Sequence, residues 1–128
     1  MDKPGKSLDL EQVIARQRRF VAERDWEKFH TPKNLVMALS RECSELLEIF
    51  QWIDGEESRS VTENPEVKAA VSDEIADVLF YLVRIADVLN IGLNDAVWQK
   101  WAKNEKKYPV DLCKGKSEKY TEYDPSKT

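Results

Sequence analysis

Apolar residues recur at three- and four-residue steps along most of this chain, which is the spacing of amphipathic helices. We predict four helices and no strands, over residues 9–25, 31–54, 64–90 and 94–107. The boundaries follow from residue types that begin or end helices. The expected N-caps are Asp9, Thr31, Asn64 and Asn94, and the expected stops are Gly55, Gly92 and Pro109.

The segments outside these helices are polar. Residues 56–64 are expected to form a loop, and 128 residues correspond to one domain. We therefore predict a flexible N-terminus over residues 1–8, a helical domain over residues 9–109, and a polar, irregular C-terminal tail over residues 110–128.

Composition excludes several classes of protein. The formal net charge of -4 argues against binding to a nucleic acid polymer, which needs a basic surface. No apolar run approaches the roughly 20 residues that a membrane span requires. The polar start of the chain does not resemble a signal peptide, so we expect a cytoplasmic protein. Two separated cysteines, Cys43 and Cys113, are too few for a disulfide framework or a zinc site.

Two of the predicted helices carry carboxylates where a buried surface is expected. On a helical wheel, Glu42 and Glu45 lie within an apolar sector, Glu74 lies within another, and Asp77 lies at its edge. The centres of these sectors are Leu35, Leu39, Cys43, Leu46, Phe50 and Ile53 on the helix over residues 31–54, and Val67, Val71, Ile75, Val78, Leu82, Ile85 and Leu89 on the helix over residues 64–90.

Burial of ionised carboxylates is costly unless they are paired or bound to metal. Arg41 and Arg84 lie on the polar sides of their helices, so few cations are expected near these acids. If the two helices pack antiparallel, four acids converge into a site suited to Mg²⁺ or Mn²⁺. One Glu-x-x-Glu pair is usually a solvated helix face, but two pairs inside apolar sectors are rarer. A ferritin-like di-metal site would need Glu-x-x-His pairs, and the chain's one histidine, His30, lies outside these helices.

The pattern Glu42-x-x-Glu45 followed by Glu74-x-x-Asp77 resembles the MazG-type all-α nucleoside triphosphate pyrophosphohydrolases. The segments RDWEKFHTPKNL, LLEIFQW, DEIADVLFYLVRIAD and KNEKKYP resemble the branch that hydrolyses dCTP. This resemblance implies an all-α, four-helix-bundle-like subunit that forms a homotetramer, with a homodimer as the alternative. The chain has more apolar and aromatic helix positions than a thin bundle can bury, Trp98 and Trp101 among them, which agrees with such an assembly.

The resemblance also implies a Mg²⁺-dependent nucleotide diphosphatase, with Mn²⁺ as a possible substitute. Glu42, Glu45, Glu74 and Asp77 would bind the metal and act in catalysis, and we assign water contact to Glu45. The expected reaction converts dCTP, or a 5-modified dCTP, and water to dCMP and pyrophosphate. Its expected role is sanitation of the nucleotide pool.

Substrate-binding residues follow from the same resemblance. Those expected at the phosphates are Lys100, Asn104, Lys107 and Tyr108, and those expected at the base are Trp26, His30, Trp52 and Tyr81. From composition alone, the lysines would read as a solvated face and the tryptophans as core. The chain has Gln17 where animal members of the branch are expected to have histidine, which leaves the preference among pyrimidines open.

Two other functions agree with parts of the pattern. A broad-specificity house-cleaning dNTP pyrophosphatase would use the same metal residues. A non-enzymatic helical interaction module would use the apolar stripes for assembly and the acids as solubilising surface. That module does not explain the two embedded carboxylate pairs.

Overall fold

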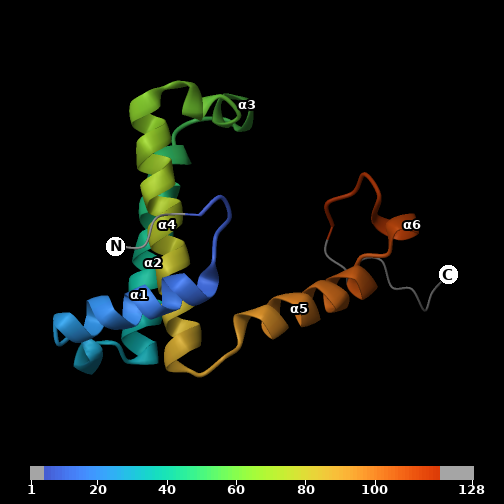
Figure 1. Cartoon of the computed structure of the whole chain (residues 1–128). Helices are drawn as coiled ribbons and strands as arrows, with labels where there is room; N and C mark the ends of the chain where they lie inside the picture. The colour runs from blue at the N-terminus through green and yellow to red at the C-terminus, as the bar shows by residue number, and fades with distance from the viewer. Residues whose placement is uncertain (1–4, 119–128) are drawn as a thin grey trace. The chain divides into compact units, whose positions relative to one another are not determined.

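The computed structural model describes residues 5–118, and all regular structure within them is helical, as predicted. The chain divides into two compact units, one ending at Ile91 and the other beginning at Gly92. The first unit contains α1 (Leu10–Glu23), η1 (Glu27–Phe29), α2 (Pro32–Phe50), α3 (Gly55–Ser58), η2 (Val61–Glu63) and α4 (Pro65–Val88) (Figure 1). The second contains α5 (Leu93–Lys107) and α6 (Val110–Cys113).

Local capping fixes where the two long helices begin. The Thr31 hydroxyl accepts a hydrogen bond from the Asn34 amide at 3.2 Å, and Pro32 follows it as the first helical residue. The Asn64 side chain accepts from the Glu66 amide at 3.0 Å and again precedes a proline. Both predicted N-caps are confirmed. They start α2 and α4 so that the two helices run antiparallel, side by side (Figure 1).

Other predicted boundaries were wrong for local reasons. Gly55 does not end a long helix. Instead, α2 ends at Phe50, and Asp54 caps a new short helix by accepting from the Glu57 amide at 2.8 Å. The N-cap of the last predicted helix is Gly92, two residues before the expected Asn94, and the Asn94 side chain accepts from Trp98 Nε1 at 3.2 Å inside the helix instead. The tail is not wholly irregular, since Val110–Cys113 forms α6.

The core of the first unit is small and lies where α4 packs on α2 and α1. Its buried apolar residues are Val21, Leu35, Val71, Val83 and Ala86. Among residues 5–118, no helix is both long and apolar enough to cross a membrane.

The predicted apolar stripe of α4 is only partly buried. Ile75 and Leu82 are 55% and 46% exposed, and Leu89 is also exposed. Cys43 of the α2 stripe is exposed as well. The reason is that α4 is apolar on more than one side, so its periodicity does not select which side faces α2. Ile75, Leu82 and Leu89 recur at seven-residue steps and form an exposed apolar strip along one face of α4.

Candidate functional site

The structure brings together three of the four predicted metal ligands. Glu42 and Glu45 of α2 and Glu74 of α4 each offer a carboxylate oxygen, and these oxygens lie within 4.8 Å of one another. The antiparallel packing of α2 on α4 produces this convergence. Asp77 lies one turn beyond Glu74 and is half-buried, but its carboxylate is not within the three-residue group.

Two of the three acids, Glu42 and Glu74, have raised pKa values. Burial is the main cause that raises the pKa of Glu42 to about 7, and the negative charges of Glu45 and Asp77 add to the rise. Burial is also the main cause that raises the pKa of Glu74, and the charges of Glu45 and Asp77 add to the rise. Asp77 therefore contributes to the field even though it lies outside the group.

One cation lies closer to the acids than expected. The Arg41 guanidinium is 3.7 Å from Glu42 Oε1, although the position of Arg41 on the polar side of its helix predicted few cations near the acids. Its side chain is 67% exposed, so solvent screens this ion pair strongly. It leaves the second oxygen of Glu42 unneutralised.

The group fits a hard divalent cation. Within residues 5–118, the buried oxygens Glu42 Oε2 and Glu74 Oε2 have no hydrogen-bond partner. Buried acceptors are rarely left unpaired in folded proteins. Oxygen ligands from carboxylates are those that Mg²⁺ and Mn²⁺ prefer. A bound cation would satisfy both oxygens and offset the mutual repulsion of the acids.

A cavity of about 610 Å³ lies between α1, η1 and α4 of the first unit. Three of the four predicted base contacts, Trp26, His30 and Tyr81, line it. The Trp26 ring also packs edge-on against Phe20, with centroids 5.8 Å apart. The remaining wall is formed by Val13, Arg16, Gln17, Phe20, Val21, Phe80 and Arg84. A mostly apolar cavity with a few polar groups suits a planar ligand such as a nucleobase.

Trp52 is not among the described residues that line this cavity. Because α2 ends at Phe50, Trp52 lies beyond the helix, and it is 87% exposed. The prediction extended the helix to residue 54 and so placed this side chain on the wrong helical face. Within the single chain, Trp52 belongs to the surface.

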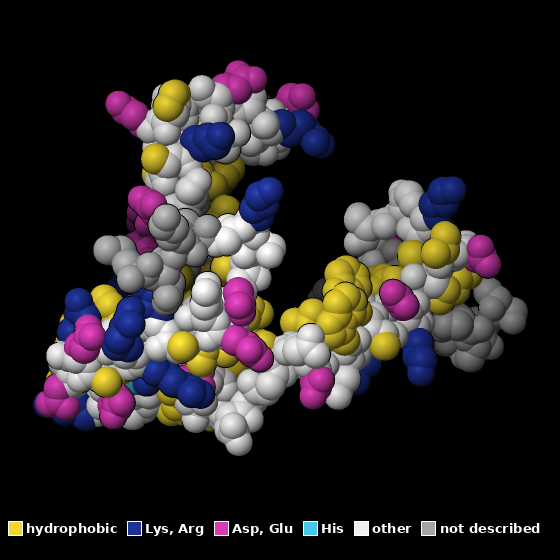
Figure 2. Space-filling view, in the orientation of Figure 1, with side chains coloured by type: hydrophobic (Ala, Val, Ile, Leu, Met, Phe, Trp, Pro, Cys, Tyr) yellow, Lys and Arg dark blue, Asp and Glu magenta, His cyan; other side chains and the backbone are white. Residues whose placement is uncertain are grey.

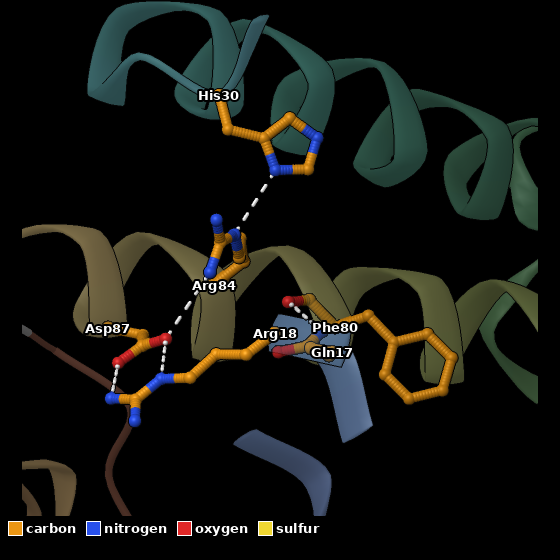
Figure 3. Close-up of polar contacts among 6 residues, drawn as sticks. All are labelled: Gln17, Arg18, His30, Phe80, Arg84 and Asp87. Atoms are coloured by element: carbon orange, nitrogen blue, oxygen red, sulfur yellow. Dashed lines mark hydrogen bonds and ion pairs between the residues drawn. The ribbon is translucent and has the colours of Figure 1, made fainter. Parts of the chain in front are cut away.

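Arg84 lines the cavity and had no predicted role, and it is held by Asp87, which pairs in turn with Arg18; neither of these two is a lining residue. Arg84 Nε donates to His30 Nδ1 at 3.1 Å, and Arg84 also pairs with Asp87 at 3.3 Å (Figure 3). Arg18 of α1 forms a two-point hydrogen-bonded ion pair with the same Asp87 carboxylate. The available signal in the sequence was their spacing. Arg84 follows Tyr81 by about one helical turn, and Asp87 follows Arg84 by another.

Gln17 lies in the same wall. Its Nε2 donates to the Phe80 carbonyl at 2.9 Å, which joins α1 to α4. Its Oε1 is buried and has no partner within the described part of the chain.

The second unit carries the predicted phosphate contacts. Lys100 and Asn104 lie on α5 around a hollow of about 350 Å³, together with Ala96, Val97 and Trp101. Lys107 is the last residue of α5, and Tyr108 follows it as the C-cap. Hydrophobic side chains gather along α5 (Figure 2), where Trp98 and Trp101 are 65% and 55% exposed.

Comparisons with known proteins show which proteins the chain is similar to. The dCTP pyrophosphatase 1 proteins of Bos taurus and Homo sapiens are each 42% identical to this chain over 113 residues, which is 88% of the chain. The match spans 67% and 66% of their own lengths. The crystal structure of a pyrophosphatase from Archaeoglobus fulgidus has a TM-score of 0.72 and 42% identity, and it covers 84% of this chain and 99% of its own. Residues 37–123 match the MazG-like family model, and the chain therefore belongs to the MazG-like family.

Proposed function

We propose that this MazG-like protein hydrolyses dCTP, or a 5-modified dCTP, to dCMP and pyrophosphate in the cytoplasmic nucleotide pool. One observation carries the proposal: α4 contributes to both an acidic group and an aromatic cavity. Glu74 belongs to the acidic group and Tyr81 lines the cavity, seven residues further along the same helix. That spacing corresponds to about 10 Å along the helix axis, on the scale of a nucleoside monophosphate.

The acidic group would hold the metal. We assign Glu42, Glu45, Glu74 and Asp77 as its ligands, with Mg²⁺ as the cation and Mn²⁺ as a possible substitute. The unpaired oxygens of Glu42 and Glu74 support this assignment. When bound, such a cation lowers the pKa of coordinated water and offsets charge on phosphate oxygens.

The chain's own residues would then place the reactants. Glu45 is half-buried whereas Glu42 is buried, so Glu45 is the better placed to contact the attacking water and accept its proton. The water oxygen bonds to the α-phosphorus, and the bond from that phosphorus to the oxygen bridging to the β-phosphorus breaks. Pyrophosphate leaves with the bridging oxygen.

Trp26, His30 and Tyr81 would hold the base, since all three line the cavity. Lys100, Asn104, Lys107 and Tyr108 would contact the β- and γ-phosphates through charge-assisted hydrogen bonds and a phenolic donor. The position of Lys100 and Asn104 at the hollow on α5 supports this assignment.

The chain would act as a homo-oligomer with a bundle-like packing of helices, a homotetramer built from two dimers or a homodimer. The exposed apolar strip of α4 and the exposed tryptophans of α5 support this assembly. Trp52, which is 87% exposed in one chain, would reach a base site only through a second copy.

Pyrophosphate release from the four common dNTPs, dUTP and 5-methyl-dCTP, with Mg²⁺ or with EDTA, tests the proposal. We expect Mg²⁺-dependent release that is strongest for dCTP or its 5-methyl form. Glu45→Ala should abolish it, while Glu48→Ala, on the exposed side of the same helix, should not. Equal release from all bases would favour the broad-specificity house-cleaning enzyme. No release from a folded oligomer would favour the helical interaction module.

A further inference from the structure

His30 is the only histidine in the chain, and its ring is held by a group that can only donate. Arg84 Nε lies 3.1 Å from His30 Nδ1. Both side chains line the aromatic cavity, and the Arg84 side chain is only 11% exposed. The contact therefore lies, partly buried, in the wall of the proposed base site.

The chemistry of this contact fixes the position of the histidine proton. A guanidinium has donors and no acceptor, and it stays protonated in proteins. Nδ1 must therefore accept, so it carries no proton. A neutral imidazole then carries its one proton on Nε2, which becomes a donor. Figure 3 shows this second ring nitrogen on the side of the ring away from Arg84.

Arg84 is itself held in place. Asp87, whose side chain is only 10% exposed, accepts from Arg84 and from Arg18 of α1. Hydrogen bonding to Arg18 is the main cause that holds the pKa of Asp87 below its usual value. The arginine is thus fixed between a buried carboxylate and the imidazole, and it has little freedom to leave Nδ1.

The surroundings of His30 favour the neutral ring. Burial, and then the charge of Arg84, lower the pKa of His30. The other ionisable groups that share its cavity are Arg16 of α1 and Tyr81 of α4, with Asp87 behind Arg84. Among the described residues that line the cavity there is no carboxylate, and Asp87 pairs with Arg84. No negative charge in the cavity wall therefore favours a protonated imidazole.

We propose that Arg84 is a positioning residue that fixes His30 as the Nε2–H tautomer, so that the cavity presents a permanent hydrogen-bond donor to the base. This rests on the proposed function. A fixed Nε2–H donor in an aromatic-lined cavity matches the carbonyl or ring-nitrogen acceptor on the edge of a pyrimidine. The substrate class at this wall is then a base with an acceptor on the edge that faces His30.

The tautomer can be measured without turnover. The full chain, labelled with ¹⁵N-histidine, gives one imidazole signal set in a long-range ¹H–¹⁵N correlation spectrum. We expect an unprotonated Nδ1 and a protonated Nε2 in the wild type. In Arg84→Met the two nitrogens should move towards averaged values, and the pKa of His30 should rise, because a positive charge has been removed. Arg19→Met, an exposed arginine of α1 outside the cavity, is the matched control.

Kinetics on dCTP supply the second readout. Arg84→Met should raise KM by about tenfold with kcat nearly unchanged, which is the effect of losing about one hydrogen bond to the base. Arg84→Lys retains a donor and a charge, so it should keep the single tautomer and recover most of the KM.

Each outcome decides a different point. A protonated Nδ1 in the wild type overturns the proposal, and this holds even if Arg84→Met does not fold. An unchanged tautomer and KM in a folded Arg84→Met protein overturn it as well, while leaving dCTP hydrolysis intact. If the wild type hydrolyses no dNTP, the proposed function fails, and the spectrum alone still decides whether Arg84 fixes the tautomer.

Discussion

Glu42 and Glu74 lie on different helices, and each buries one carboxylate oxygen without a partner among residues 5–118. Packing of α2 on α4 forces these acids together, and burial raises the pKa of both. The convergence of these acids therefore destabilises the metal-free fold, and a divalent cation would remove this destabilisation.

Mg²⁺ should stabilise the folded protein. At a free Mg²⁺ concentration ten times its Kd, binding to the folded state alone adds about 1.4 kcal/mol, or about 5 °C in Tm for a domain of this size. Thermal unfolding at fixed protein concentration, with and without EDTA, measures the shift. Glu74→Gln should lose most of it and Glu48→Gln should keep it. An equal shift in both variants would place the cation elsewhere.

The stability of the metal-free protein should fall as pH rises from about 5 to 8. Glu42 has a pKa of about 7 against an ordinary value of 4.5, so the folded state holds its proton more tightly than the unfolded state does. That contribution is present at low pH and is lost as pH rises through about 7. The raised pKa of Glu74 acts in the same direction. The lowered pKa of His30 acts in the opposite direction, because its contribution is lost as pH falls.

Comparison with Glu42→Gln isolates the Glu42 contribution. Denaturant unfolding in EDTA at several pH values should give a steeper loss of stability in the wild type than in this variant. Saturating Mg²⁺ should flatten the difference, because the cation replaces the proton. Parallel pH profiles in EDTA would show that Glu42 titrates normally.

Removal of the Trp26 ring should weaken binding of the base and leave the chemistry intact. Stacking on an aromatic side chain is worth about 1–3 kcal/mol per base, so Trp26→Ala should raise KM for dCTP by about tenfold or more. In the proposed function the ring would contact the base and not the reacting phosphorus, so kcat should change little. Steady-state kinetics measure both constants. Phe29→Ala, which removes a ring exposed outside the cavity, should leave KM unchanged.

Features set by local chemistry were predictable from the sequence, and features set by packing were not. Thr31 and Asn64 were identified as caps because each bonds to an amide two or three residues away. Asn94 was assigned the same role wrongly because its side chain has a competing local partner, Trp98. The face of α4 could not be chosen, because Ile75 and Leu82 belong to an apolar surface that one chain does not cover.

The candidate site shows the same division. The spacing of Glu42, Glu45 and Glu74 was enough to expect convergence, since helical periodicity and antiparallel packing bring them together. The role of Arg84 depends on His30, which is distant in sequence and reaches it only after the helices pack. Periodicity placed Arg84 on a polar face and carried no information about that partner.

Trp52 provides a test of whether the site is shared between copies. In one chain it is 87% exposed and lies outside the cavity, so a contribution to the base site requires a neighbouring subunit. Trp52→Ala should then raise KM, and Glu45→Ala should abolish turnover. If Trp52 acts across the interface, a mixed dimer contains one site with both residues intact. Denaturing and refolding the two variants together in equal amounts should restore turnover with a wild-type KM.

The expected size of this recovery distinguishes the possibilities. At dCTP far below the KM of Trp52→Ala, only intact sites contribute; random pairing gives half mixed dimers, each with one of two sites intact, so activity should approach about a quarter of the wild-type value per chain. If Trp52 acts within its own chain, or only on the surface, the mixture should show no more than the Trp52→Ala protein it contains. Refolding Glu45→Ala with Glu42→Gln is the control, because both changes lie in the same acidic group of one chain and no pairing restores that group.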